Sequence, residues 1–487
     1  MSLRQLLRTL ILVWWALAGT LALSALFIFP VMKGVMAGLL PVIVGVVAAI
    51  SLRLVPVHWK TRSTERLAAI PDRLWLAGVC LLAFLLRLPG ILSPALPTND
   101  GDTFAYLADA KSLAAGNGIP NILFPPGQAA WLALWVSRFG DNLQVLALAQ
   151  TILTLGAIVI LYAVLKNRTI VAARWGTLVI AAMPSLVLFS STLGHETTDM
   201  FSQVAILATY LLGIQRERTR GSVLIWPLLG VIAGLAALVH PTFLVVPILV
   251  GFNLWLMRVP LLRCLTPVLL TGLAAAMVVL PWSLRNYRHY GHFSAISANF
   301  GRTLLEANQS GSLGVYSNIS SFISTEPNPV LQDRMAFKEA LRVIHSDPLR
   351  FFYLCGRRTI YMWGTDTSML EFVLGDPPHG GTVRKALLSV VIQTFWAWLV
   401  CAWCLSGWIS LRSKSLSPED LWCVTSIGVI WLVHGFLVEG LSRHHLSLIP
   451  LIAVTVLPSY LAWVRSSRST AIAKEAQLAG SRTLAWR

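Results

Sequence analysis

The sequence predicts an all-α polytopic membrane protein with about twelve transmembrane helices. Of its 487 residues, 56% are hydrophobic and only 12% are charged, whereas about a quarter of the residues in a typical soluble domain are charged. A helix needs about twenty mostly apolar residues to cross a bilayer, and stretches of this kind follow one another along the chain. This composition excludes a water-soluble globular protein.

The apolar stretches contain almost no charge, with only Arg87 and Asp199 inside them. The first is too long for the apolar part of a signal peptide, so we expect it to remain as a membrane helix. His240 and Pro241 divide the uncharged segment 221–257 into two spans. The predicted spans are 9–29, 34–52, 74–92, 143–165, 175–194, 197–214, 221–239, 241–257, 264–284, 386–411, 421–438 and 446–464.

The distribution of basic residues predicts the orientation of these spans. With the N-terminus in the cytoplasm, the inner segments hold 22 of the 38 basic residues and six of the 21 acidic residues. The longer outer segments then hold 16 basic and 15 acidic residues. Because cytoplasmic loops of membrane proteins carry an excess of Lys and Arg, this orientation is favoured. The formal charge of +17 is thus explained by topology, and no basic run resembles a nucleic-acid-binding face.

The predicted organisation has three parts. Residues 1–73 form two additional N-terminal helices with a basic inner loop, 74–464 form the membrane core, and 465–487 form a basic cytoplasmic tail. Two long outer loops, 93–142 and 285–385, interrupt the core, and long loops of this kind usually carry function. Amphipathic patterns predict a helix at 103–115 in the first loop and another at 330–344 in the second, within a small extracytoplasmic helical lobe.

Acidic residues at the predicted outer face are the first candidates for chemistry. Asp100 and Asp102 form a D-x-D pattern before the helix at 103–115, and Glu196 lies at an outer hairpin. Such carboxylates can cap a helix, act as a general base, or bind a divalent metal ion. The three uses remain open on the residues alone.

Basic residues at the same face are candidates for binding a phosphate. Arg87 lies near the outer end of the third span, Arg285 follows Pro281 and Trp282, and Arg443 and His444 precede the last span. A single arginine at a membrane interface often contacts only lipid headgroups. Several arginines at one outer opening would form a phosphate site.

A set of motifs in a fixed order resembles one superfamily of membrane enzymes. The order is Leu86-Arg87; Asp102-x3-Tyr106; Ala108-x-Ala110; Phe124-Pro125-Pro126-Gly127; Glu196; Gly234-Leu235-x3-Val239-His240-Pro241; Leu280-Pro281-Trp282-x2-Arg285-Asn286-Tyr287; and Ser442-Arg443-His444-His445 with Pro450. In this order the chain, from about Leu74 to Val464, resembles the GT-C superfamily of glycosyltransferases that use polyprenyl-phosphate sugars. The similarity is to the bacterial relatives of protein O-mannosyltransferases and aminoarabinose transferases, that is, to glycosyltransferase family 39.

The resemblance implies roles for particular residues. Asp102 takes the place of the catalytic base, with Asp100 as the alternative, and Glu196 takes the place of the second acidic site. The residues that it implies for the substrate and its lipid phosphate are Arg87, Tyr106, Arg285, Asn286, Arg443 and His444.

The sequence also departs from the family pattern. Thr103 follows Asp102 where many members have Glu, and His240 stands where Arg or Lys often precedes Pro. Leu123 and Phe124 replace the acid and Lys of the aminoarabinose transferases, which argues against that subgroup. These departures also weaken a metal site carried over from the family, and a divalent metal ion at Asp100 and Asp102 is left as an open alternative.

The implied reaction moves a sugar from a polyprenyl-phosphate donor to a hydroxyl acceptor, with inversion, at the outer face of a bacterial inner membrane. The acceptor, lipid-linked or protein-linked, and the sugar remain open. A transporter or flippase of lipid-linked saccharides is one alternative and a polysaccharide polymerase is another. A transporter would place charged residues near helix centres, but His434 is the clearest polar group inside a span, and we interpret it as a packing residue.

Overall fold

The computed structural model describes residues 2–34, 36–55, 62, 65–94, 102–216, 223–315, 325–367, 370 and 381–465. Regular structure in these ranges is helical throughout and includes no strand. The all-α prediction is therefore confirmed for the described part of the chain. Asp100 and the tail beyond residue 465 lie outside it.

Each predicted span coincides with one helix or with two helices in succession. The corresponding segments are α1 (Leu3–Met32), η1 (Met36–Gly38) with α2 (Leu39–Ser51), α4 (Asp72–Leu92), α7 (Leu143–Lys166), α8 (Ile170–Ala182) with α9 (Pro184–Phe189), α10 (Glu196–Arg216), α11 (Ile225–Val239), η2 (Pro241–Val245) with α12 (Val246–Leu256), α13 (Leu261–Tyr290), α19 (Gly381–Ser413), α20 (Pro418–Trp431) with η3 (Leu432–Leu437), and α22 (Ile449–Arg465). Within the described ranges, six helical segments are long and apolar enough to cross a membrane: α1, α4, α7, α13, α19, and α20 with η3. The full count of twelve spans stays a prediction.

Two helices differ from the predicted bounds for local reasons. The stretch 175–194 is broken after Met183, because Pro184 has no N–H to continue the helix and starts the short helix α9. Conversely, α13 does not end near residue 284 but continues through Pro281 to Tyr290, where Gly291 adopts a left-handed conformation (φ 69°) and ends it.

The N-terminal helices α1 and α2 pack against α19, and small residues allow the close approach. A Cβ atom on Gly19 would lie 2.7 Å from the Cα atom of Cys404, and a Cβ atom on Gly45 would overlap the carbonyl oxygen of Thr394. Helix pairs in membranes commonly use small residues in this way. The predicted extra helices thus contact the membrane core directly.

Polar contacts join loops that were predicted to lie on the same side of the membrane. Arg168 bonds Asp420 at 2.8 Å, and Arg8 donates to the carbonyl of Leu416 at 3.0 Å, all in predicted inner segments. Asp72 bonds Lys166 and accepts a 2.7 Å hydrogen bond from Tyr162 in the same inner region. These contacts place the segments that carry them next to one another, while the orientation of the spans stays a prediction.

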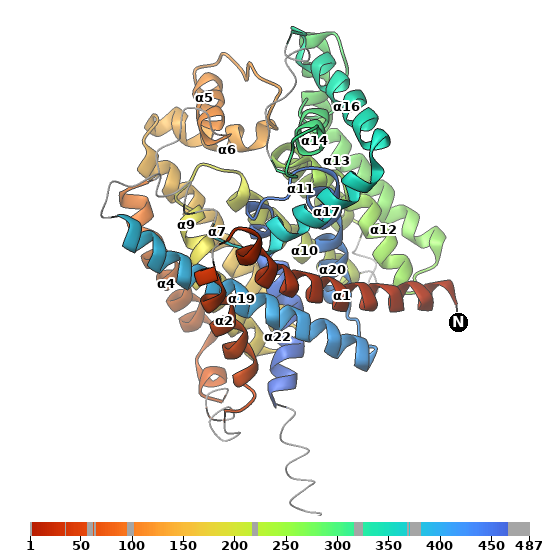
Figure 1. Cartoon of the computed structure of the whole chain (residues 1–487). Coiled ribbons are helices and arrows are strands. Elements are labelled where there is room, and N and C mark those ends of the chain that lie inside the picture. Colours follow the sequence, from red (N-terminus) through yellow and green to blue (C-terminus); the bar gives the residue numbers. More distant parts are fainter. Residues whose placement is uncertain are drawn as a thin grey trace, which may run out of the picture.

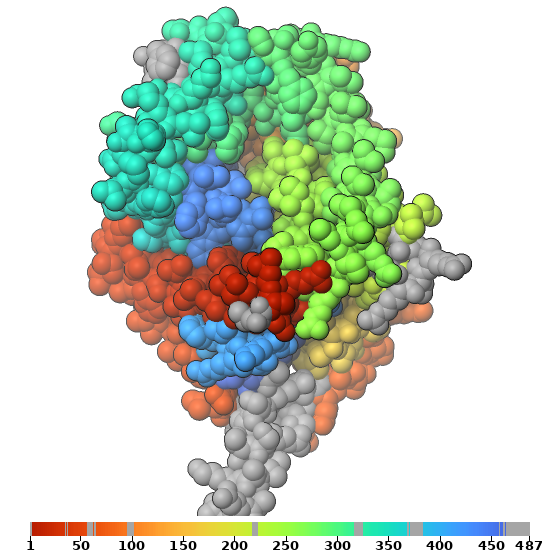
Figure 2. Space-filling view, turned by 90° about the vertical axis from the view of Figure 1, so that its right-hand side faces the viewer, coloured from red at the N-terminus to blue at the C-terminus, as the bar shows by residue number. Residues whose placement is uncertain are grey.

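The outer loops form a helical lobe at the opposite end of the molecule (Figure 1). The first loop contains α5 (Asp102–Ala114) and α6 (Pro126–Phe139), and the second contains α14 (Phe300–Asn308), α16 (Pro329–Ser346) and α17 (Pro348–Trp363). The predicted helices 103–115 and 330–344 are confirmed as α5 and α16. Figure 2 shows the green and teal segments of the second loop covering this end of the molecule.

Candidate active site

Arg443 joins acidic side chains from three separate parts of the chain. Its Nη1 atom lies 2.7 Å from Oδ2 of Asp102 and 3.9 Å from Oε1 of Glu196, and its Nη2 atom lies 3.8 Å from Oε1 of Glu439. The Nε atom of Arg443 is buried and has no hydrogen-bond partner among the described residues. On a guanidinium group, Nε and Nη2 form one edge that can hold two oxygens of a phosphate, so this edge is the part of Arg443 suited to a ligand.

Asp102 is positioned by the packing of α5 onto α6. Tyr106, one turn further along α5, is buried and packs edge-on against Phe124, with ring centroids 5.3 Å apart. The ring of Tyr106 also lies edge-on to the ring of His195, with ring centroids 6.1 Å apart. Asp102 is the first residue of the helix, where the helix dipole favours an anion.

Glu196 is positioned by two buried glutamines that hold the preceding turn. Gln128 on α6 donates to the carbonyls of Leu193 and Gly194, and Gln150 on α7 also donates to Gly194, at distances of 2.9 to 3.0 Å. A Cβ atom at position 194 would overlap Oε2 of Glu196. Gly194 therefore provides the space that the Glu196 carboxylate occupies.

Arg443 is positioned by the chain reversal between η3 and α22. The short helix α21 (Arg443–Leu446) follows this reversal, and His445 within it is fully buried. Its Nδ1 donates to the carbonyl of Met362 at 2.5 Å, and its Nε2 lies 2.9 Å from Oδ1 of Asp366. These contacts fix α21 to the end of α17.

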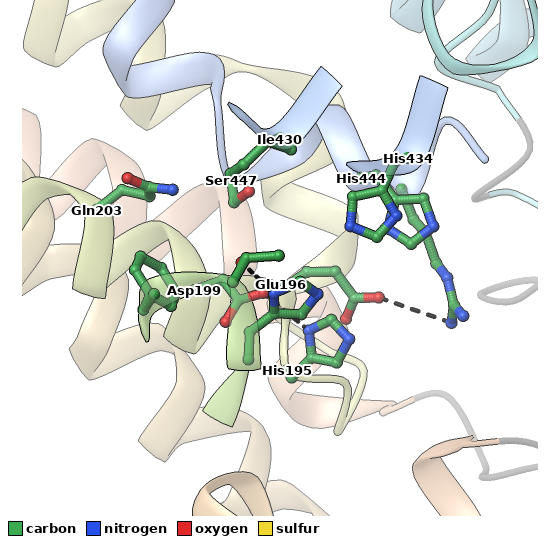
Figure 3. Close-up of a pocket in the computed structure, with 12 residues that line it drawn as sticks. His195, Glu196, Asp199, Gln203, Ile430, His434, His444 and Ser447 are labelled. Atoms are coloured by element: carbon green, nitrogen blue, oxygen red, sulfur yellow. Dashed lines mark hydrogen bonds and ion pairs between the residues drawn. The ribbon is translucent and has the colours of Figure 1, made fainter. Parts of the chain in front are cut away.

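A narrow pocket, partly open to solvent, lies beside Arg443. Figure 3 shows the Glu196 carboxylate in this pocket, between the pair formed by His195 and Asp199 and the stacked rings of His434 and His444. The residues that line it are His195, Glu196, Asp199, Gln203, His240, Thr242, Phe243, Ile430, His434, Arg443, His444 and Ser447.

Four imidazole rings follow one another along the pocket. The ring centroids of His195 and His240 are 5.4 Å apart, those of His240 and His434 are 5.5 Å apart, and those of His434 and His444 are 3.7 Å apart. His434 belongs to η3, a π-helical turn that ends α20. π-Helical turns often occur at functional sites.

The charges of the site favour an ionised Asp102 and a protonated His195. Burial alone would raise the pKa of Asp102, but the charge and hydrogen bond of Arg443, with the charge of His195, hold it below its ordinary value. Burial alone would lower the pKa of His195, but the carboxylates of Glu196 and Asp199 raise it to about 9. The Nδ1 atom of His195 lies 3.0 Å from Oδ2 of Asp199. At neutral pH the site therefore holds two cations, Arg443 and His195.

The structure brings some predicted site residues together and places others elsewhere. Asp102, Glu196, Arg443 and His444 lie at one site, with Tyr106 in the adjacent packing. Asp100 lies outside the described residues.

Arg87, Arg285 and Asn286 have different contacts. Arg87 is buried and donates to the carbonyls of Ala83 and Ala181, each at 3.0 Å. Arg285 bonds the carbonyl of Ile119 and lies over the ring of Trp282, 4.7 Å from its centroid. Asn286 is fully buried, accepts a bond from Arg285, and donates to the carbonyl of Ile296. Of the three predicted arginines, Arg443 is the one whose described contacts include Asp102 and Glu196.

Sequence reasoning missed several residues of the site. Glu439 stands four positions before Arg443, a spacing that often marks an ion pair. This spacing could have predicted that Glu439 lies beside Arg443. His434 was interpreted as a packing residue, whereas the structure places it in the pocket lining. His195 gave no comparable signal, because isolated histidines beside apolar stretches are common, and His240 was noted only as a departure from the family pattern.

The divalent metal site considered from the sequence uses Asp100, which lies outside the described residues. Oδ2 of Asp102 bonds Arg443, and no group of three His, Cys, Asp or Glu side chains suited to a metal ion occurs in the described ranges. We therefore derive no step of the reaction through a metal ion.

Comparison with known proteins gives matches among solved structures. No protein-family model and no curated protein sequence matches the chain. The oligosaccharyltransferase AglB from Archaeoglobus fulgidus, in complex with an inhibitory peptide and a dolichol-phosphate, is 15% identical with a TM-score of 0.47, over 84% of this chain and 51% of that chain.

Two further matches are similar. The Archaeoglobus fulgidus oligosaccharyltransferase in complex with Zn and sulfate is 15% identical with a TM-score of 0.46, over 81% of this chain and 53% of that chain. ArnT from Cupriavidus metallidurans bound to undecaprenyl phosphate is 15% identical with a TM-score of 0.39, over 81% of this chain and 77% of that chain. The chain spans about half the length of the oligosaccharyltransferases that it matches.

Proposed function

We propose that this protein transfers a sugar from a polyprenyl-phosphate donor to a hydroxyl acceptor at the outer face of the membrane. The observation that carries the proposal is the ion pair between Arg443 and Asp102, at 2.7 Å, beside a pocket rich in hydrogen-bonding side chains. A cation for a departing phosphate and a carboxylate for an attacking hydroxyl are the two groups that such a displacement needs.

In the proposed reaction Arg443 binds the donor phosphate through its Nε and Nη2 edge. The acceptor hydroxyl oxygen attacks the anomeric carbon, and its proton passes to the Asp102 carboxylate. The bond between the anomeric carbon and the phosphate oxygen breaks, and the polyprenyl phosphate leaves with the electron pair, stabilised by the charge of Arg443. A single displacement of this kind inverts the anomeric centre.

The arrangement also couples the donor to the base. Arg443 holds Asp102 ionised, and a phosphate bound to the same guanidinium partly neutralises its positive charge. Asp102 then becomes a stronger proton acceptor once the donor is bound, because the cation that stabilises its anionic form is shared.

The distribution of basic residues supports an orientation with the N-terminus in the cytoplasm and this site on the extracytoplasmic side. We further propose that the membrane is a bacterial inner membrane. The acceptor is a hydroxyl group on a lipid or a protein. A divalent metal ion at Asp100 and Asp102 is a secondary proposal, tested by assaying transfer after exhaustive chelation and after adding the ion back.

The test is transfer of labelled sugar from polyprenyl-phosphate sugars by the purified protein in lipid vesicles. We expect Asp102→Asn to reduce turnover by a factor on the order of 10² to 10⁴, the usual contribution of a general base, while donor binding is retained. Asp141→Asn is the matched control, because Asp141 is an outer aspartate paired with Lys111 on the exposed surface. Undiminished turnover by Asp102→Asn would remove Asp102 as the base.

A further inference from the structure

Helix α17, in the second outer loop, lies against the predicted outer end of α1 (Figure 1). The rings of Tyr361 on α17 and Phe29 on α1 meet edge-on, with centroids 5.7 Å apart, and a Cβ atom on Gly364 would overlap the Cβ atom of Phe29. Lys33 directly follows α1, which is long and apolar enough to cross a membrane. Lysines and tyrosines at the end of such a helix commonly lie at the level of the lipid headgroups.

One face of α17 is apolar and exposed. Leu349, Phe352 and Tyr353 expose 84%, 65% and 61% of their surface, whereas Leu354 and Arg358 on the opposite face are buried. A helix with one exposed apolar face beside a membrane-spanning helix can lie along the bilayer surface, with that face toward the lipid. We therefore examined α17 for groups that could contact a lipid headgroup.

Arg357 is held between two tyrosines on α17. Its Nη1 donates to the hydroxyl of Tyr353 at 3.0 Å, and its Nη2 donates to the hydroxyl of Tyr361 at 3.2 Å. The Nζ atom of Lys33 lies 4.9 Å from the ring centroid of Tyr361, so Lys33 and Arg357 flank the same ring. Because both hydroxyls accept from Arg357, the hydrogen of each hydroxyl can be donated to another acceptor.

The charge of this cluster is positive and is not balanced by a carboxylate of the described residues. The ion pairs found among those residues include neither Lys33 nor Arg357, and the buried Nε atom of Arg357 has no hydrogen-bond partner there. Burial alone would raise the pKa of Tyr361, but the hydrogen bonds and charges of Arg357 and Lys33 hold it below its ordinary value. The cluster therefore favours an anion.

We propose that this surface binds one anionic phospholipid of the outer leaflet. The lipid phosphate lies between Lys33 and Arg357 and accepts hydrogen bonds from the two tyrosine hydroxyls. The acyl chains lie against α1, which exposes Ile28 and Val31 just before Lys33. The described ion pairs of Arg443 join it to Asp102, Glu196 and Glu439 and to no residue of this cluster, so the site is separate from the candidate active site.

The test is native mass spectrometry of the purified full-length protein in detergent, titrated with phosphatidylglycerol or with phosphatidylcholine that carries the same acyl chains. Phosphatidylcholine has the same phosphate but no net charge. We expect phosphatidylglycerol to bind at least about tenfold more tightly. Lys33→Gln and Arg357→Gln should each lower its affinity about fivefold, the usual effect of one basic residue at an anionic membrane surface. The double variant should bind the two lipids equally.

Three controls identify the site and the ligand. Lys338→Gln removes the same charge from an exposed position on α16, and it should keep the preference for phosphatidylglycerol. Arg443→Ala should also keep it, because Arg443 belongs to the candidate active site. Glycerol phosphate carries a phosphate without acyl chains, and at equal concentration it should not displace the lipid.

Thermal unfolding shows whether each variant is folded. Lys33 is exposed, so Lys33→Gln tests the site even if Arg357→Gln does not fold. Equal affinity of the wild-type protein for the two lipids would overturn the inference, and so would a preference that the double variant retains. Loss of the preference in Arg443→Ala would place the lipid at the active site instead, and displacement by glycerol phosphate would assign the cluster to free phosphate. Because the measurement requires no sugar transfer, its result is independent of the proposed function.

Discussion

The Nη1 atom of Arg443 lies 2.7 Å from Oδ2 of Asp102, although the two residues are 341 positions apart in the chain. Asp102 begins the first helix of one outer loop, whereas Arg443 follows the last but one predicted span. Their contact therefore depends on the correct packing of the helices between them. It also means that the proposed base and the proposed phosphate-binding cation are in direct contact.

Replacing Arg443 should weaken donor binding more than any other single change at the site. Arg443→Ala removes the phosphate ligand and leaves Asp102, Glu196 and Glu439 without their shared cation. Truncating one partner of a buried charge pair costs about 2–5 kcal/mol, so we expect donor affinity to fall on the order of 10²-fold. Isothermal titration with a polyprenyl phosphate in detergent micelles measures this.

Arg443→Lys distinguishes charge from geometry. Lysine keeps the positive charge but lacks the planar edge formed by Nε and Nη2. We expect Arg443→Lys to bind the donor better than Arg443→Ala and worse than the wild-type protein. A lysine variant with wild-type affinity would show that the two-oxygen phosphate contact is not used.

Transfer should fall as the pH rises through about 9, the pKa of His195. Below this pH His195 is an imidazolium that compensates Glu196 and Asp199, and above it the pocket gains net negative charge and repels the donor phosphate. The pKa of His195 in the folded protein lies above the ordinary value of about 6.5 for histidine. Its contribution to the stability of the folded state is therefore complete below about pH 6.5 and is lost as the pH rises through about 9.

The measurement is the pH dependence of kcat/KM for wild type and His195→Gln. Glutamine keeps a hydrogen-bond donor for Asp199 but does not titrate, so this variant should lose the alkaline limb near pH 9. An unchanged limb in His195→Gln would assign it to another group.

Gly194→Ala should impair transfer while the fold remains intact. A Cβ atom at this position would overlap Oε2 of Glu196, and a carboxylate at the end of a flexible side chain can move away. We expect Glu196 to shift and kcat/KM to fall at least about tenfold, since small misplacements at a reacting site are costly. The control is Gly78→Ala in α4, where a Cβ atom meets nothing within 4 Å. Equal activity of the two variants would contradict the role assigned to Gly194.

The helices could be predicted from the sequence because their signal is local. Uninterrupted apolar stretches bounded by basic residues need no knowledge of the partner helices. The break at Pro184 depends on a single missing N–H group, and α13 continues past residue 284 into contacts outside the predicted span. Asn286, for example, donates to the carbonyl of Ile296 at 3.2 Å. Such contacts exist only after folding.

The site was predictable where a charged residue stood at an outer helix end. Asp102, Glu196 and Arg443 satisfied this condition, and the structure brings them together. Arg285 also stands at an outer helix end, but its guanidinium bonds the carbonyl of Ile119. The partner of such a long side chain depends on which groups the packing of the fold brings close to it. His434 was interpreted as a packing residue from its apolar neighbours in sequence, and the structure places it in the pocket lining, stacked on His444.

Arg358 should be required for the stability of the segment that carries Arg443. It is fully buried, and its guanidinium donates to the carbonyls of Phe436 and Ala307 and to Oδ1 of Asn308, which joins η3 to α14. Arg358→Met would remove this donor from the carbonyl of Ala307 and from Oδ1 of Asn308, at a cost of about 1–3 kcal/mol for each group left unsatisfied. Arg357→Met is the matched control, since Arg357 bonds the hydroxyls of Tyr353 and Tyr361 near the surface.

Thermal unfolding in detergent should show a clearly lower Tm for Arg358→Met than for Arg357→Met. Donor binding should also be weaker in Arg358→Met, because Arg443 loses its fixed position. If the two variants unfold at the same temperature, the hydrogen bonds of Arg358 do not hold the Arg443 segment in place.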